Sequence, residues 1–251
     1  MNSIVEKCLI VAATPCFVET CLALTPASDN FNAASLNKNR WTLENAGKGK
    51  LAPAGGKIGF TVGSGPTGDD FGILELKNNR PGFNENWEVI LDVTNASGQG
   101  YEVGTGLLIY NVDDYGDQVG LEFNGKGRNA GFVSLGITND RDNPQQDIRV
   151  NPNITSGSLR ITFDKTTKFF TFWYDRTGSV DGFEWVQIST FSTTGKGGDR
   201  RGNWSMNPSG GKFGIQLYGF AENRSVARGK VSFDNFKLRA LQPVIARVRP
   251  E

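Results

Sequence analysis

The chain has 251 residues, with 27 basic and 26 acidic side chains, 32 glycines, three cysteines and no histidine. The absence of histidine excludes Ser-His-Asp and Cys-His nucleophiles and zinc sites built on imidazole. A formal net charge of +1 excludes the strong long-range attraction that draws basic proteins to nucleic acid or to anionic membranes.

The first 23 residues have the pattern of a secretory signal. Lys7 precedes an apolar run over residues 8–18, and Ala23 is a small residue at which a signal peptidase would cut. All three cysteines fall in this segment, so no disulfide is expected in the rest of the chain. We expect residues 1–23 to be a cleaved signal peptide and the protein to be secreted or extracytoplasmic. The alternative is a leader segment of a cytosolic protein.

The rest of the chain is expected to form strands joined by tight turns. Twelve short segments alternate apolar and polar side chains and are rich in β-branched and aromatic residues: 41–44, 57–62, 71–77, 87–94, 106–110, 118–123, 131–138, 158–163, 168–174, 185–191, 212–218 and 231–238. No window shows a helical period, so the pattern predicts an all-β, antiparallel sandwich. The longer polar stretches 139–153 and 192–211 are expected to be loops. Residues 24–241 are expected to form one domain and residues 242–251 a C-terminal tail.

Most aromatic side chains are expected to lie in the core, because they occupy strand positions that fit an inner face. This predicted core contains Phe31, Trp41, Trp87, Phe123, Phe163, Phe172, Trp185, Phe213, Phe233 and Phe236. Both faces of the segment 168–174 are apolar, which predicts a central strand.

A glycine-rich segment over residues 63–68 matches the pattern G-x-G-x-x-G. In a phosphate-binding loop this pattern opens a helix whose N-terminus holds the phosphate. Here residues 69–76 continue as a strand pattern, so we interpret the segment as a plain loop.

The order of the segments resembles the concanavalin A-like lectin/glucanase superfamily, a jelly-roll sandwich that is shared with laminin-G-like modules. The residues that carry the resemblance are the segment 28–31 with Leu36 and Trp41, then 87–93, 107–114, 172–175 with Trp185, and finally 231–238. The resemblance implies an antiparallel jelly-roll β-sandwich in which the first and last strands lie side by side, so that the two Asp-Asn-Phe segments are neighbours. It also implies carbohydrate binding or, in some branches, polysaccharide cleavage.

The glucanases of this fold carry a strand of the form Glu-x-Asp-x-Glu or Glu-x-Asp-x-x-Glu, and this chain has none. Glu88 and Asp92 share a strand face but lie about 13 Å apart along it, whereas a glycosidase pair needs about 5–9.5 Å. Asp140 and Asp142 fall in a predicted loop. Polysaccharide lyases on similar folds use Tyr with His or Asn and Arg, and here Tyr and Arg remain available. The sequence therefore favours a protein that is not an enzyme, with an atypical hydrolase or lyase as the alternative.

A sugar-binding site needs exposed aromatic rings beside amide, carboxylate or guanidinium groups. Trp204 is the first candidate, because it lies in a polar loop with Arg200, Arg201 and Asn203. The alternative is that this loop folds over and caps the core. Four further rings lie on strand faces or in turns: Tyr101, Tyr110, Trp173 and Tyr218.

Three aspartates, Asp113, Asp114 and Asp117, lie in a turn between two strands and are the candidate ligands for calcium, which relatives of this fold bind through carboxylate, amide and carbonyl oxygens. No other cofactor is expected. The sequence thus predicts a monomeric, secreted, non-catalytic carbohydrate-binding or adhesion domain whose partner is a polysaccharide or glycan, with no nucleic-acid binding and no membrane insertion. A structural or protein-interaction domain without a sugar ligand is a third interpretation.

Overall fold

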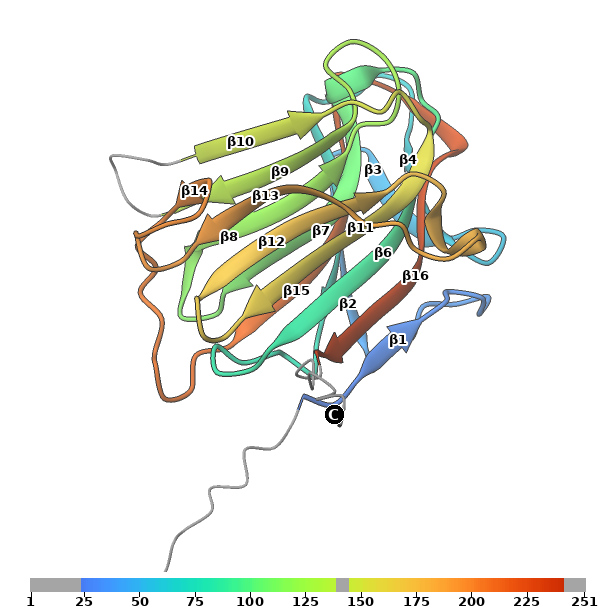
Figure 1. Ribbon diagram of the computed structural model, residues 1–251. Helices are drawn as coiled ribbons and strands as arrows, with labels where there is room; N and C mark the ends of the chain where they lie inside the picture. The colour runs from blue at the N-terminus through green and yellow to red at the C-terminus, as the bar shows by residue number, and fades with distance from the viewer. Residues whose placement is uncertain (1–23, 139–144, 242–251) are drawn as a thin grey trace, which may run out of the picture.

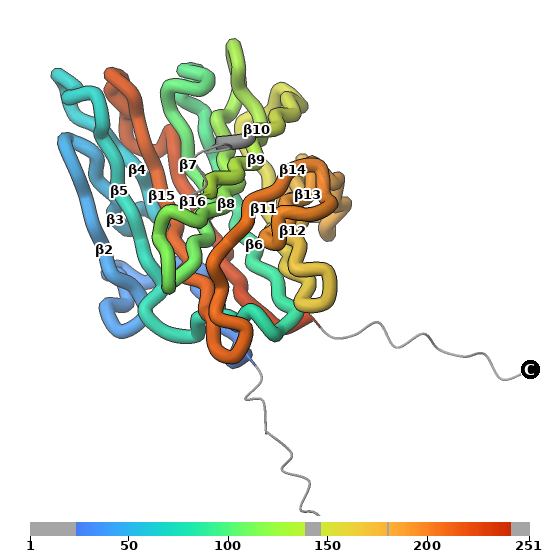
Figure 2. The backbone as a smooth tube through the Cα atoms, turned by 90° about the vertical axis from the view of Figure 1, so that its left-hand side faces the viewer, coloured from blue at the N-terminus to red at the C-terminus, as the bar shows by residue number. Residues whose placement is uncertain are grey.

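The computed structural model describes residues 24–138 and 145–241, which form two stacked β-sheets (Figures 1 and 2). The nine-stranded sheet has the order β14 (Arg200–Arg201), β13 (Val186–Ser192), β12 (Phe169–Asp175), β11 (Ser156–Asp164), β6 (Trp87–Asn95), β16 (Val226–Ala240), β4 (Ile58–Val62), β3 (Gly49–Pro53), and β1 (Ala27–Asp29) also pairs with β16. The seven-stranded sheet has the order β10 (Gln145–Val150), β9 (Phe132–Ile137), β8 (Asp114–Phe123), β7 (Val103–Asn111), β15 (Phe213–Glu222), β5 (Asp69–Leu76), β2 (Trp41–Ala46). The 3-10 turns η1 (Gly100–Glu102) and η2 (Gly178–Val180) are the described helical elements.

The predicted antiparallel β-sandwich is confirmed, and each of the twelve predicted strands is present. The one parallel pairing within the described residues joins β13 to the two-residue strand β14. The sequence missed β1, β3, β10 and β14, of which β10 and β14 lie in stretches expected to be loops. These strands are short or polar and stand at or near sheet edges, where alternation is weak because a solvent-exposed strand needs few apolar residues.

In the described part of the chain, no helix has the length and apolar character that a membrane span requires.

The two ends of the fold meet as the resemblance implied. β1 pairs with β16 so that Asp29 lies opposite Phe236, which makes the two Asp-Asn-Phe segments neighbours (Figure 1). Trp41 joins them, because its indole N–H donates to Asp29 Oδ2 at 2.9 Å and its ring packs on Phe236 at 5.0 Å. Asn235 adopts a left-handed backbone conformation (φ 50°) within a β-bulge of β16. The bulge re-aims the strand there.

Aromatic rings fill the space between the sheets. Nine of the ten rings predicted for the core are buried, and Trp185 is the exception. Phe163 lies at the centre of the cluster, with ring centroids of Trp87, Phe170 and Phe213 within 5.8 Å of its own. β12 lies between β11 and β13, so the prediction of a central strand there is confirmed.

Replacing Phe163 by Ala should destabilise the protein by about 3–5 kcal/mol, because the side chain is fully buried and the rings around it cannot close the cavity. Leu43→Ala is the matched control, since Leu43 is 44% exposed and its truncation should cost less than about 0.5 kcal/mol. Urea unfolding of the two variants measures the difference, and equal losses would contradict this description of the core.

Candidate functional site

The outer face of the seven-stranded sheet carries a row of tyrosine, glutamate and glutamine side chains. We call it the tyrosine face and define it by Glu75, Tyr110, Glu122, Gln216 and Tyr218. These residues alternate with core residues along β5, β7, β8 and β15. Gln216 pairs with Glu75 on β5, and Tyr218 faces Gly106 on β7, which in turn faces Glu122 on β8. The pleat of four strands thus brings residues that are distant in sequence to one surface.

Tyr110 crosses a neighbouring strand to reach a carboxylate. It pairs with Gly214 on β15, and a Cβ atom on this glycine would lie 2.0 Å from Tyr110 Cζ, so no larger residue fits under the ring. The Tyr110 hydroxyl donates to Glu75 Oε1 at 2.6 Å, and Arg80 bonds to the same oxygen at 2.8 Å. Burial, together with the hydrogen bond to Glu75, raises the pKa of Tyr110 to about 12. The phenol therefore stays protonated and acts as a donor.

Tyr218 also reaches a carboxylate two strands away, on the other side of β15 from Glu75. Its hydroxyl donates to Glu122 Oε2 at 3.0 Å, across β7. Desolvation of Glu122 outweighs the hydrogen bonds from Asn124 and Tyr218 and raises the pKa of its carboxyl group to about 7. Burial and the nearby carboxylate in turn raise the pKa of Tyr218 well above its ordinary value. Arg149 extends the row by donating to Asn124 Oδ1 at 3.2 Å.

Tyr115 is the most exposed ring beside this surface, with 52% of its area accessible. Its ring packs against Tyr110 at 4.8 Å, and its hydroxyl donates to Gln216 Oε1 at 3.3 Å. Exposed ring surface therefore stands directly beside an amide and the Glu75 carboxylate. This combination can pack against apolar C–H groups and hydrogen-bond hydroxyl groups of the same ligand.

The carboxylates of this face are not placed for glycoside hydrolysis. Glu75 and Glu122 lie on strands separated by β7 and β15, a distance of about 14 Å across the sheet. Retaining and inverting glycosidases need about 5–5.5 Å and about 6.5–9.5 Å. Tyr218 is a poor general base, because its raised pKa keeps the proton on the oxygen.

The outer face of the nine-stranded sheet carries a second cluster, made of three aromatic rings and one cation. Its members are Trp173, Phe183, Trp185 and Arg160. The guanidinium carbon of Arg160 lies 5.7 Å from the centroid of Trp173 and 5.5 Å from that of Trp185. Phe183 stacks on Trp185 at 4.6 Å. Glu88, which is 1% exposed, holds Arg160 at 2.6 Å. The rings and the cation thus satisfy one another by cation–π and stacking contacts.

The prediction that Trp185 belongs to the core is therefore wrong. The residue precedes β13, and its ring packs on the outside of the sheet against Arg160 and Phe183.

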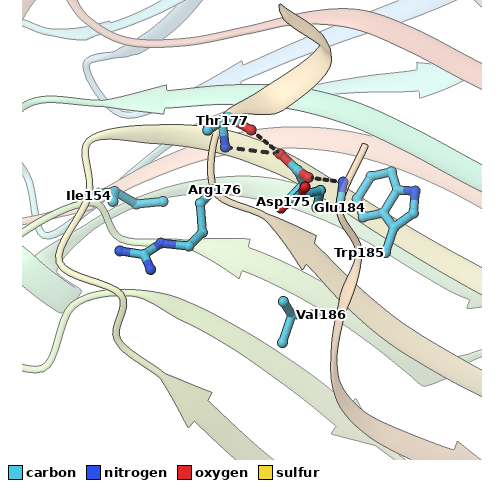
Figure 3. A pocket seen from close by; sticks show the side chains of 7 residues that line it. All are labelled: Ile154, Asp175, Arg176, Thr177, Glu184, Trp185 and Val186. Atoms are coloured by element: carbon cyan, nitrogen blue, oxygen red, sulfur yellow. Dashed lines mark hydrogen bonds between the residues drawn. The ribbon is translucent and has the colours of Figure 1, made fainter. Parts of the chain in front are cut away.

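A hollow of about 630 Å³ lies beside Trp185 (Figure 3). Arg176 and Trp185 stand on opposite sides of it in Figure 3. Asp175 also lines it, but its carboxylate accepts hydrogen bonds from the backbone N–H groups of Thr177, Gly178 and Glu184. Asp175 thus holds its own loop together, and we assign it a structural role.

The structure places the first candidate loop against the core. Trp204 is 6% exposed, and its ring lies 5.6 Å from Phe170 and 5.7 Å from Phe191. Arg200 is also 6% exposed; it donates to the Ser134 carbonyl at 2.8 Å, and burial lowers its pKa to about 10. A sugar cannot stack on a ring that is covered in this way. The prediction that Trp204 and Arg200 contact a ligand is therefore wrong. The alternative applies: this loop folds over and caps the core.

The other candidate residues are scattered. Arg201 and Asn203 are exposed beside the cap, and Tyr101 is 46% exposed in η1. Trp173 lies on the outer face of the nine-stranded sheet, whereas Tyr110 and Tyr218 come together on the tyrosine face. Sequence reasoning missed Glu75, Glu122 and Gln216, although alternation within their predicted strands would have placed them on the same face.

The three aspartates proposed for calcium do not form a joint ligand set. Asp117 is 2% exposed and accepts hydrogen bonds from Asn111 Nδ2, Thr138 Oγ1 and the Ser205 N–H at 3.2–3.4 Å. Asp113 is exposed in the turn, and Asp114 caps the Gly116 N–H at 3.0 Å. Within residues 24–138 and 145–241 no group of three or more acidic, His or Cys side chains could hold a metal ion. These residues do not fit the calcium site that the resemblance implied.

Comparison with known proteins finds similar structures and no similar sequence. No protein family and no curated protein matches the sequence. A β-1,3-glucanase from Mycobacterium marinum matches with a TM-score of 0.52 and 11% identity, over 86% of this chain and 97% of that one. The exoplasmic/lumenal domain of VIP36, in a form bound to Ca²⁺ and Man2, matches with a TM-score of 0.52 and 10% identity, over 86% of this chain and 88% of that one. An immunostimulatory antigen and pseudo β-1,3-glucanase of Mycobacterium tuberculosis matches with a TM-score of 0.53 and 11% identity, over 86% of this chain and 98% of that one. At these identities the likeness shows a shared fold.

The raised pKa of Glu122 predicts a pH-dependent stability. Because the folded state binds this proton more tightly than the unfolded state, the contribution is complete below the ordinary pKa of 4.5 and is lost as the pH rises through about 7. From about pH 5 to about pH 8 the wild type should lose on the order of 2 kcal/mol more than Glu122→Gln, which has no proton to lose. Urea unfolding at both pH values tests this, and parallel pH profiles would contradict it.

Proposed function

We propose that this chain, which has the concanavalin A-like fold that lectin domains and glucanases share, is a non-catalytic carbohydrate-binding domain. The observation that carries the proposal is the tyrosine face, where tyrosine rings, carboxylates and an amide lie together on the outside of one sheet. In this proposal residues 1–23, which lie outside the described part of the chain, direct secretion. The domain then acts as a monomer outside the cytoplasm.

The chemistry of the tyrosine face fits a glycan. Sugar rings present C–H groups on their faces and hydroxyl groups around their edges, and Tyr115 supplies an exposed ring for the former. Glu75 supplies carboxylate oxygen acceptors beside it, and the buried Gln216 holds the Tyr115 hydroxyl in place. Glu75 and Glu122, the two half-buried carboxylates of this face, lie about 14 Å apart across the sheet. This length exceeds a single sugar ring, so an oligosaccharide or polysaccharide chain fits better than a monosaccharide.

A hydrolase with an unusual site is the second candidate, because a carboxyl group with a pKa of about 7 at Glu122 suits a general acid. Glu75, the other carboxylate of this face, lies about 14 Å from Glu122, which is farther than the separation of the two carboxylates in glycosidases.

Binding to immobilised polysaccharides tests the proposed function. Tyr115→Ala and Glu75→Gln should each weaken retention by about tenfold, because each removes one side of the proposed contact. Tyr101→Ala is the control, since Tyr101 is 46% exposed but lies outside the tyrosine face, and it should bind as the wild type does. Affinity electrophoresis over a panel of neutral glucans, mannans and galactans measures the ratios. A wild type that binds none of them, or variants that bind equally well, would overturn the proposal.

A turnover assay separates the two candidates. We expect no new reducing ends and no unsaturated products when the wild type is incubated with the same panel and with acidic polysaccharides. Turnover that Glu122→Gln abolishes while glycan retention persists would replace the binding domain by a hydrolase or lyase.

A further inference from the structure

A basic hollow of about 650 Å³ lies over one corner of the nine-stranded sheet, away from the tyrosine face. The turns β2–β3, β4–β5 and β15–β16 lie at this end of the sandwich (Figure 2). Lys48, Lys50 and Arg228 line the hollow, and each comes from a different segment: the β2–β3 turn, β3 and β16. None of the described residues that line it is acidic or aromatic.

The charges of these three cations are poorly balanced. Among the residues that the structure describes, none of the three forms a salt bridge. Asp70 lies behind Lys48 and attracts its charge, but it is 1% exposed, its oxygens accept bonds from the Lys48 N–H and from Thr67, and it forms no ion pair with Lys50 or Arg228. In a chain whose formal net charge is only +1, such a grouping costs repulsion unless an anion compensates it.

The wall of the hollow is held in place by hydrogen bonds to backbone carbonyl groups. The ammonium group of Lys48 donates to the Ser64 carbonyl at 2.8 Å, and the Ser225 hydroxyl donates to the Gly63 carbonyl at 3.1 Å. These contacts fix the glycine-rich segment 63–68, which runs directly into β5. An ammonium group has three N–H donors, so Lys48 keeps donors for an oxyanion after bonding to Ser64.

We propose that this hollow binds the anionic groups, sulfate or carboxylate, of an acidic polysaccharide. Guanidinium and ammonium groups are the side chains that bind such oxyanions most strongly. The volume of about 650 Å³ exceeds what one small anion occupies, and the cations come from separate segments, so several charges along one chain fit better than a single ion. A nucleic acid fits less well, because the residues that line the hollow include no ring on which a base could stack. This site goes beyond the proposed function and does not depend on the tyrosine face.

Charge reversal tests the site with dextran sulfate as the probe and neutral dextran as the control ligand. At about 50 mM salt, Lys50→Glu and Arg228→Glu should each weaken dextran sulfate binding by about tenfold, because each replaces an attraction by a repulsion. Lys165→Glu is the matched control, since Lys165 is exposed in the β11–β12 turn at the opposite end of the sheet, and its effect should stay below about twofold. Equal losses in all three variants would show a non-specific charge effect and overturn the proposal.

Competition experiments identify whether the anion belongs to a polysaccharide, to a free oxyanion or to a nucleic acid. Polygalacturonate should compete with dextran sulfate, whereas inorganic sulfate at the same concentration of charged groups should compete far less. Equal competition by inorganic sulfate would show a site for a free oxyanion, and tighter binding of a single-stranded oligonucleotide would show a nucleic-acid site; either result overturns the proposal. Tyr115→Ala should leave dextran sulfate binding unchanged, so failure of the neutral-glycan test and failure of this one are distinguishable. The melting temperatures of the variants confirm that they are folded.

Discussion

The packing of aromatic rings between the two sheets is the interaction on which the rest of this structure depends. Phe163, Trp87, Phe170 and Phe213 meet there with centroids 4.9–5.9 Å apart. Burial of such rings is the main favourable term in folding. Because strand side chains alternate between faces, a strand that sends one residue into this core must send the next one outwards. The positions left for function are therefore those between the core residues.

The two outer faces use these positions differently. On the nine-stranded sheet, Glu88 holds Arg160 and Arg239, and Arg160 lies between two tryptophan rings, so charges and rings satisfy one another. On the seven-stranded sheet, Tyr110 lies over the bare backbone of Gly214, and exposed ring surface remains at Tyr115. On both faces the polar groups bond to one another, but the seven-stranded sheet also leaves the Tyr115 ring 52% exposed beside Glu75 and Gln216. This contrast is the physical reason for placing glycan binding on the seven-stranded sheet.

The two proposed sites rest on different forces. The tyrosine face offers ring surface and hydrogen-bonding groups, which depend little on ionic strength. The basic hollow offers three cations that form no salt bridge with the described residues, and their attraction for an anion falls as salt shortens the Debye length. In these two proposals the domain binds a glycan chain by its exposed ring and an acidic chain by its cations, on separate surfaces.

Much of this fold could be predicted from the sequence, because strand alternation and turn residues are local properties. Twelve of the sixteen described strands and nine of ten core rings were predicted from them. Edge strands such as β10 could not be, because a polar strand becomes a strand only when its neighbour supplies hydrogen bonds. Trp185 and Trp204 show the same limit for side chains. Trp185 was predicted to be buried and lies outside, and for Trp204 the sequence left open a sugar contact or a cap on the core, of which the structure shows the cap.

The sequence by itself determined the fold class, the alternation of inward and outward residues and the lack of a glucanase motif. Tertiary structure alone decided that Tyr110 reaches Glu75, that Tyr218 reaches Glu122 and that the loop of Trp204 closes over the core. It also decided that Lys50 and Arg228, which are far apart in sequence, line one hollow. Alternation assigns a residue to a face, but only the register and the path of the loops determine which residues meet there.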